Sequence, residues 1–247
     1  MADDTRRREQ LRQSVTTYLD LIEEAKALIG GTVYTQQTWD LSTILDVLDP
    51  PSIDFNSIDG VSLRVLESMV SGCTSCRLSE GRTMTVFGEG SVPARLMVIG
   101  EGPGAEEDKS GRPFVGKAGE YLDTWLKAIH LERTAGVYLA NIVKCRPPQN
   151  RDPQVDEREA CLPYLRRQIQ LVNPRMILLV GRTAAQTLLK TDEGLASLRG
   201  RYHRWEGIPT VVTYHPAAVL RNTETLRRPV WEDLKRVAAF LGIELGR

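Results

Sequence analysis

The sequence lacks a long hydrophobic run, a surplus of charge of either sign and an N-terminal pattern typical of a signal peptide. Its longest apolar runs, such as MILLVG at 176–181, are far too short to cross a bilayer. The opening MADDTRRREQ is charged and does not resemble a signal peptide. The 32 basic residues balance the 32 acidic ones, so a nucleic-acid binder would need a local basic surface. We therefore expect a soluble cytoplasmic protein with no membrane contact.

Cysteine is also scarce, and its spacing limits what it can do. The four cysteines follow the pattern C-x2-C, then 68 residues, then C-x15-C; they are Cys73, Cys76, Cys145 and Cys161. A disulfide framework is not expected in a reducing cytosol. One interpretation is a chance C-x2-C pair with two buried core cysteines. A thioredoxin-like redox pair is disfavoured because no strand pattern leads into GCTSC.

The remaining interpretation of the cysteines is a metal centre. Four thiolates suit either zinc or an iron–sulfur cluster. Structural zinc sites usually combine two short paired spacings, and C-x15-C is not one of them. The spacing therefore favours a cluster, while both metals stay open on sequence chemistry alone.

The first 60 residues differ in pattern from the rest. Residues 5–30 carry apolar side chains at three- and four-residue steps between Arg, Gln and Glu, which predicts an amphipathic helix ending at Gly30-Gly31. DPPSIDFNSIDG at 49–60 is typical of a linker or loop. We expect a helical extension with a linker over 1–60 and a separate domain over 61–247.

From residue 95 onward, strand and helix patterns alternate. RLMVIG (95–100), VYLANIVK (137–144), RMILLVG (175–181) and TVVTYH (210–215) are short β-rich runs with helical stretches between them. This alternation predicts α/β units: one three-layer α/β/α domain around a central, mainly parallel four-stranded sheet. Ligands bind at the carboxyl ends of such strands. GEGPG, residues 141–150, GRT and HPAAVLRN should therefore share one rim.

The GEGPG loop at 100–104 does not match a nucleotide site. Its G-x-G-x-G spacing fits neither the P-loop nor the dinucleotide motif, and nearby carboxylates would repel a pyrophosphate. One interpretation is a tight turn with solvated acids. The other is a backbone-lined pocket for a flat, neutral ring, with Glu101 as a base or charge stabiliser and Phe114 stacking on the ring.

Other polar side chains on the predicted rim are ambiguous by themselves. His215 ends a strand before a proline, where a structural and a catalytic role are both open. Asn141 lies at a strand end and could read a donor–acceptor edge or cap a turn. The alanine, valine and leucine residues of HPAAVLRN could simply begin a helix. Alternatively, Leu220 is a wedge that enters the DNA duplex while Arg221, Arg227 or Arg228 holds phosphates.

Together, GEGPGAEEDKSGRPFVGKAG (100–119), NIVKCRPPQNRDP (141–153), HPAAVLRN (215–222) and the cysteine spacing resemble the family 4 uracil-DNA glycosylases of the uracil-DNA glycosylase superfamily, over residues 71–240. The resemblance implies a monofunctional, monomeric enzyme of base-excision repair. Such an enzyme flips deoxyuridine out of DNA and hydrolyses its N-glycosidic bond, leaving an abasic site.

The resemblance also implies roles for individual residues. The implied ligands of a [4Fe–4S] cluster are Cys73, Cys76, Cys145 and Cys161. The implied catalytic residues are Glu101, His215, Glu107 and Asn150. The implied substrate-binding residues are Gly100, Gly102, Pro103, Gly104, Phe114, Asn141, Leu220 and Arg221. Two other functions stay open: a non-catalytic iron–sulfur protein that binds DNA or senses uracil, and a hydrolase of free nucleotides.

Overall fold

The computed structural model describes Ile58 and residues 60–246. The chain divides between Ser57 and Ile58, and all described residues belong to the second unit. The helix predicted over 5–30 and nearly all of the linker predicted over 49–60 lie outside the described residues. Within the described part, no helix is both long and apolar enough to cross a membrane.

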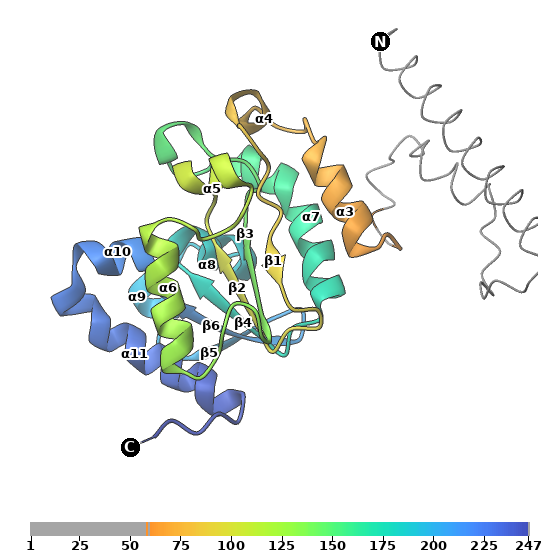
Figure 1. Ribbon diagram of the computed structural model, residues 1–247. Coiled ribbons are helices and arrows are strands. Elements are labelled where there is room, and N and C mark those ends of the chain that lie inside the picture. Colours follow the sequence, from red (N-terminus) through yellow and green to blue (C-terminus); the bar gives the residue numbers. More distant parts are fainter. Residues whose placement is uncertain (1–57, 59, 247) are drawn as a thin grey trace, which may run out of the picture. The chain divides into compact units, whose positions relative to one another are not determined.

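A six-stranded sheet forms the centre of this unit, in the order β1-β3-β2-β4-β6-β5 (Figure 1). The four inner strands are parallel: β2 (Leu96–Gly100), β3 (Val137–Asn141), β4 (Met176–Val180) and β6 (Ile208–Thr213). The outer strands β1 (Glu89–Gly90) and β5 (Tyr202–Trp205) pair antiparallel. The predicted parallel four-stranded centre is confirmed, and the two edge strands were not predicted. Strand β1 is only two residues long, and YHRW in β5 is polar, so neither shows an apolar strand pattern.

The inner strands are apolar on both faces, which explains their parallel pairing. Every residue of β2, β3 and β4 is buried. Parallel sheets need this because crossover helices cover both sides. Alternate side chains of β2 point to opposite faces, so Met97 and Ile99 join one core and Leu96 and Val98 the other.

Helices cover both faces of the sheet and make the three layers (Figure 1). One core includes residues of α7 (Val155–Val172), α8 (Arg182–Leu189) and α9 (Leu195–Leu198). The other includes residues of α6 (Lys117–Ala128), α10 (Pro216–Arg221) and α11 (Thr223–Phe240). The short elements near the rim and the cysteines are α3 (Leu63–Ser71), α4 (Leu78–Gly81), α5 (Ala105–Ser110) and the 3-10 turn η2 (Pro148–Asn150).

Candidate functional site

The loops at the carboxyl edge of the sheet are bonded to one another. The N–H of Ile142 donates to the carbonyl of Gly100 at 2.9 Å, and that of Val143 to the carbonyl of Glu101 at 3.2 Å. On the neighbouring strands, the N–H of Gly181 donates to the carbonyl of Thr213 at 2.9 Å. The four segments predicted to share a rim are therefore held as two bonded pairs, after β2 and β3 and after β4 and β6.

Gly100 lies where two candidate ligand-binding side chains meet. A Cβ atom at this position would lie 2.6 Å from Oδ1 of Asn141 and 2.7 Å from Cζ of Phe114. Any other residue would push one of them away. A Cβ on Gly102 would similarly meet Cγ2 of Val143 at 2.8 Å. The glycines let the loop backbone approach the end of β3 closely.

Asn141 presents an amide that the protein itself does not use. The residue is only 3% exposed. Its side chain has no hydrogen-bond partner among the described residues, while its backbone carbonyl accepts from Nζ of Lys144 at 3.1 Å. Its amide oxygen and nitrogen are therefore available to a ligand that supplies both a donor and an acceptor.

Phe114 is held in an unusual backbone conformation. Its φ is 54°, in the left-handed region, and its side chain is buried. The Arg133 guanidinium fixes this turn by donating to the carbonyls of Pro113 at 2.8 Å and Phe114 at 2.6 Å. The Phe114 ring lies near-parallel to that of His215, with centroids 6.3 Å apart and 27° between the planes. A rigid aromatic wall thus faces the histidine.

His215 is built to be a neutral hydrogen-bond donor. It is the N-cap of α10, and its Nδ1 accepts from the N–H of Ala217 at 3.2 Å. Burial, assisted by the charge of Arg221 and opposed by that of Glu107, lowers the pKa of His215 to about 4. With Nδ1 an acceptor and the ring neutral, the proton sits on Nε2, which is left to donate.

Glu101 is the half-buried carboxylate of the same rim. Burial raises its pKa, while a hydrogen bond from Thr183 and the charges of Arg182 and Arg158 oppose the shift. Glu101 forms no ion pair with any described residue, so its charge is not neutralised by a direct partner. Such a carboxylate can take a proton or stabilise a nearby cation.

Glu107 is engaged by backbone groups. Its Oε2 accepts from the N–H of Gly104 at 3.1 Å, and its Oε1 from those of Val115 and Gly116 at 2.9 and 3.0 Å. These bonds tie the glycine loop to the segment that follows Phe114. The contacts are those of a positioning residue, and the catalytic role suggested for Glu107 stays a prediction.

The other predicted residues occupy the outer part of the rim. Pro103 is buried, whereas Asn150 is exposed and its Oδ1 accepts from Nε of Arg146 at 2.8 Å. Leu220 is 45% exposed near the end of α10, followed by the exposed Arg221. Among the described residues, Asn150 has no hydrogen bond to Glu101 or His215, so its predicted role has no direct geometric support.

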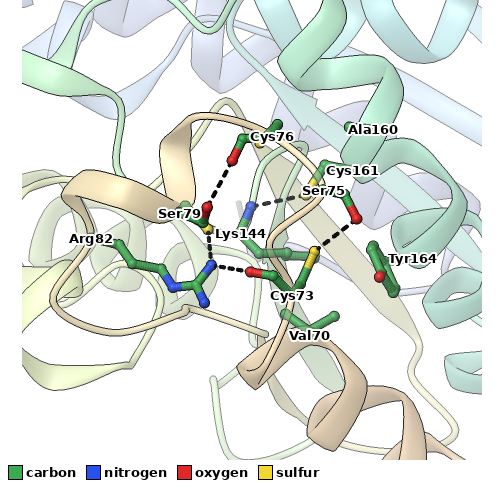
Figure 2. A pocket seen from close by; sticks show the side chains of 11 residues that line it. Val70, Cys73, Ser75, Cys76, Ser79, Arg82, Lys144, Ala160, Cys161 and Tyr164 are labelled. Carbon is green, nitrogen blue, oxygen red and sulfur yellow. Dashed lines mark hydrogen bonds between the residues drawn. The ribbon is translucent and has the colours of Figure 1, made fainter. Parts of the chain in front are cut away.

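The four cysteines line a separate pocket. Cys73 and Cys76 lie between α3 and α4, Cys145 follows β3, and Cys161 is in α7. In Figure 2, Cys73, Cys76 and Cys161 are labelled around this pocket, with Lys144 and Arg82 beside them. Within the described residues, no group of three or more His, Cys, Asp or Glu is arranged to hold a single metal ion.

N–H donors surround the sulfur atoms. Nη1 of Arg82 donates to Sγ of Cys145 at 3.3 Å and to the carbonyl of Cys73 at 2.6 Å. The backbone N–H of Lys144 donates to Sγ of Cys161 at 3.3 Å. Burial raises the pKa of Cys76, Cys145 and Cys161, and the cations of Arg82 and Lys144 oppose that shift at Cys145 and Cys161. The same N–H donors would stabilise the sulfur atoms once a metal holds them as thiolates. The donor set therefore fits a centre bound by four thiolates.

Lys144 also connects the two sites. It is 1% exposed, and its Nζ donates to Oε1 of Gln168 at 2.6 Å as well as to the carbonyl of Asn141. Burial lowers its pKa to about 8. Sequence reasoning missed Lys144, Arg82 and Arg133, because no motif or spacing distinguishes them from ordinary basic residues.

The fold and the rim define an α/β protein that can hold a flat polar ring between an aromatic wall, a free amide, a neutral imidazole donor and a carboxylate. Residues 87–235 match the family model described as the uracil DNA glycosylase superfamily. The chain belongs to that superfamily.

Individual relatives carry a more specific name. A type-4 uracil-DNA glycosylase from Thermotoga maritima is 41% identical over 72% of this chain and 94% of its own length. One from Sulfurisphaera tokodaii is 44% identical over 71% of this chain and 83% of its own. One from Pyrobaculum aerophilum is 40% identical over 76% and 97%.

Proposed function

We propose that this protein is a monofunctional uracil-DNA glycosylase of base-excision repair, acting as a cytoplasmic monomer. It hydrolyses the N-glycosidic bond of deoxyuridine in DNA and leaves an abasic site. The observation that carries the proposal is the neutral, Nε2-protonated His215 facing Phe114 at the end of β6. The identity of 41% with a type-4 uracil-DNA glycosylase supports the same activity.

The chemistry requires opposite charges to be stabilised at two places. As the bond between C1′ and the base nitrogen breaks, its electron pair goes to the base, and the sugar becomes cationic. Nε2 of His215 donates to a uracil oxygen as negative charge builds there. One preorganised donor of this kind is worth about 3 kcal/mol, on the order of a hundredfold in rate.

Glu101 serves the other half of the reaction. Its carboxylate stabilises the cationic sugar and takes a proton from the attacking water, whose oxygen forms the new bond to C1′. Its raised pKa, caused mainly by burial, makes it a better proton acceptor than an exposed glutamate. The lack of an ion-pair partner among the described residues leaves that charge available.

Base selection falls to Asn141 and Phe114. Uracil presents an N–H and a carbonyl where cytosine presents an acceptor and an amine, so a fixed amide distinguishes them. An unsatisfied group in a dry pocket costs roughly 1–3 kcal/mol. The ring of Phe114 supplies the stacking face, and the backbone of the 100–104 loop completes the pocket around the base.

We propose a [4Fe–4S] cluster for the cysteine pocket, held by Cys73, Cys76, Cys145 and Cys161. When bound, the cluster supplies metal–sulfur bonds that cross-link the α3–α4 segment, the end of β3 and α7. Four thiols lining one pocket support a metal centre. The C-x15-C spacing, which is not a second short pair, favours a cluster over zinc. Broad visible absorption with iron and sulfide supports the cluster, whereas a colourless protein with stoichiometric zinc contradicts it.

The deciding experiment is a uracil-excision assay. The protein is incubated with a labelled oligonucleotide containing one uracil, followed by alkali, which breaks the strand at an abasic site. We expect breakage at the uracil and none in the thymine-containing control. Tight binding without breakage would indicate the non-catalytic alternative. Equal release of uracil from free deoxyuridine monophosphate would indicate a nucleotide hydrolase.

A further inference from the structure

A groove between α6 and α11 is not used by the proposed reaction. It has a volume of about 1000 Å³, at the upper end of the range of small-molecule sites. Three aromatic side chains line it, Tyr121 and Trp125 from α6 and Trp231 from α11. The rings of Tyr121 and Trp125 meet edge to face, with centroids 5.4 Å apart.

Basic side chains lie beside these rings. Arg227 and Arg228 line the groove together with one acidic residue, Glu224, so that the lining carries one net positive charge. Both arginines are exposed, and neither forms an ion pair within the part of the chain that the structure describes. Because the whole chain has no net charge, this local surplus is a feature of the groove.

The groove begins at the predicted DNA wedge. Helix α10, which carries Leu220 and Arg221, packs against both α6 and α11 (Figure 1). Only Asn222 separates α10 from the first residue of α11, Thr223, which itself lines the groove. A DNA strand that leaves the rim past Leu220 therefore reaches the groove without crossing another helix or β-strand of the protein.

We propose that the α6–α11 groove binds a single-stranded stretch of the substrate DNA beside the target nucleotide. Aromatic faces stack on bases of any sequence, and unpaired arginines hold phosphates, which is the combination that single-stranded DNA sites use. Trp231, 36% exposed, is the stacking face open to solvent, and Arg227 and Arg228 are the phosphate contacts. This inference rests on the proposed function only for the position of the DNA strand, beside the nucleotide whose base is excised. Binding of single-stranded DNA to the groove does not itself require uracil.

The test measures binding of uracil-free, single-stranded oligothymidine of increasing length to the full chain. We expect the affinity of the wild type to rise with length until the groove is filled. Trp231→Ala should lower the affinity for a long oligomer about tenfold, the value of one stacked base. Each of Arg227→Ala and Arg228→Ala should reduce the slope of log affinity against log salt by about 0.7.

Arg236→Ala is the matched control, because it removes the same charge from α11 at a position that does not line the groove. It should leave affinity and salt slope unchanged. If Trp231→Phe retains the affinity that Trp231→Ala loses, stacking and not folding is responsible. Wild-type affinity in Trp231→Ala, Arg227→Ala and Arg228→Ala would overturn the proposal, as would equal effects of Arg236→Ala. Failure of the proposed function is seen separately, as no strand breakage in the uracil assay.

Discussion

The cysteine pocket and the rim at the carboxyl edge of the sheet are connected by Lys144, yet their polar groups have different hydrogen-bond partners. Around the cysteines, sulfur atoms receive N–H bonds from Arg82 and Lys144. On the rim, among the described residues, the side-chain amide of Asn141 has no hydrogen-bond partner, and the carboxylate of Glu101 accepts a hydrogen bond from Thr183 but has no ion-pair partner. Satisfied polar groups stabilise a fold, whereas unsatisfied ones are available to a substrate. The comparison separates a region built for stability from one built for chemistry.

The largest expected effect comes from removing a cysteine. Cys161→Ser should lose the metal centre and lower the free energy of unfolding by several kcal/mol, because metal binding contributes directly to folding. Metal content per chain and denaturant unfolding measure this. Ser75→Ala, which changes a side chain that lines the same pocket, should keep the metal. A stable, metal-free Cys161→Ser protein would remove the distinction between the two regions.

The second effect belongs to the rim. His215→Ala should lower kcat by roughly 10²–10³-fold through loss of one preorganised donor, while the free energy of unfolding falls by only about 1 kcal/mol through loss of the N-cap of α10. His130→Ala alters an exposed histidine at the end of α6 and should leave both values unchanged. An equal fall in stability and activity for His215→Ala would mean that the histidine is structural.

The pH dependence sharpens the same distinction. Burial raises the pKa of Glu101 above its ordinary value of 4.5, and the reaction needs the deprotonated form. We expect kcat/KM to fall about tenfold per pH unit below that raised pKa. The pKa of His215 is about 4, so its imidazole stays neutral until the pH falls close to 4. In Glu101→Gln the remaining activity should lose this acidic limb, and an unchanged pH profile would assign the limb to another group.

Lys144 belongs to both regions, so its replacement tests whether they are independent. Lys144→Met leaves Oε1 of Gln168 and the carbonyl of Asn141 without this donor, and the free energy of unfolding should fall by about 1–3 kcal/mol. KM for the uracil substrate should also rise, because Asn141 shifts. In an Asn141→Ala background the rise in KM should disappear. Additive effects would show that the rim does not depend on Lys144, and Lys127→Met, an exposed lysine of α6, is the control.

Much of the fold followed from local patterns. Four apolar runs separated by amphipathic stretches predict a parallel sheet covered by helices, and the strands β2, β3, β4 and β6 form there. The edge strand β5 escaped prediction because YHRW carries no apolar alternation, and it forms only because β6 offers unpaired backbone groups. Pairing between distant segments decides such strands.

The candidate site likewise contains residues that the sequence predicted and residues that it did not. GEGPG, Asn141 and His215 lie at the ends of predicted strands, so the rule that ligands bind at strand ends selected them. Arg133 follows no such rule: it supports Phe114 from 19 residues away in the sequence. Glu107 carries a carboxylate like its neighbours, and only the folded chain gives it three backbone N–H groups.

The sequence by itself determined the layered α/β architecture, the order of the rim motifs and the presence of four thiols, because these depend on hydrophobic period and residue type. Only the tertiary structure decided that the thiols line one pocket, that His215 has its proton on Nε2 and that Lys144 lies buried between the two sites. These features depend on distances between segments far apart in the chain, and on burial, which sets the protonation of a side chain through its surroundings.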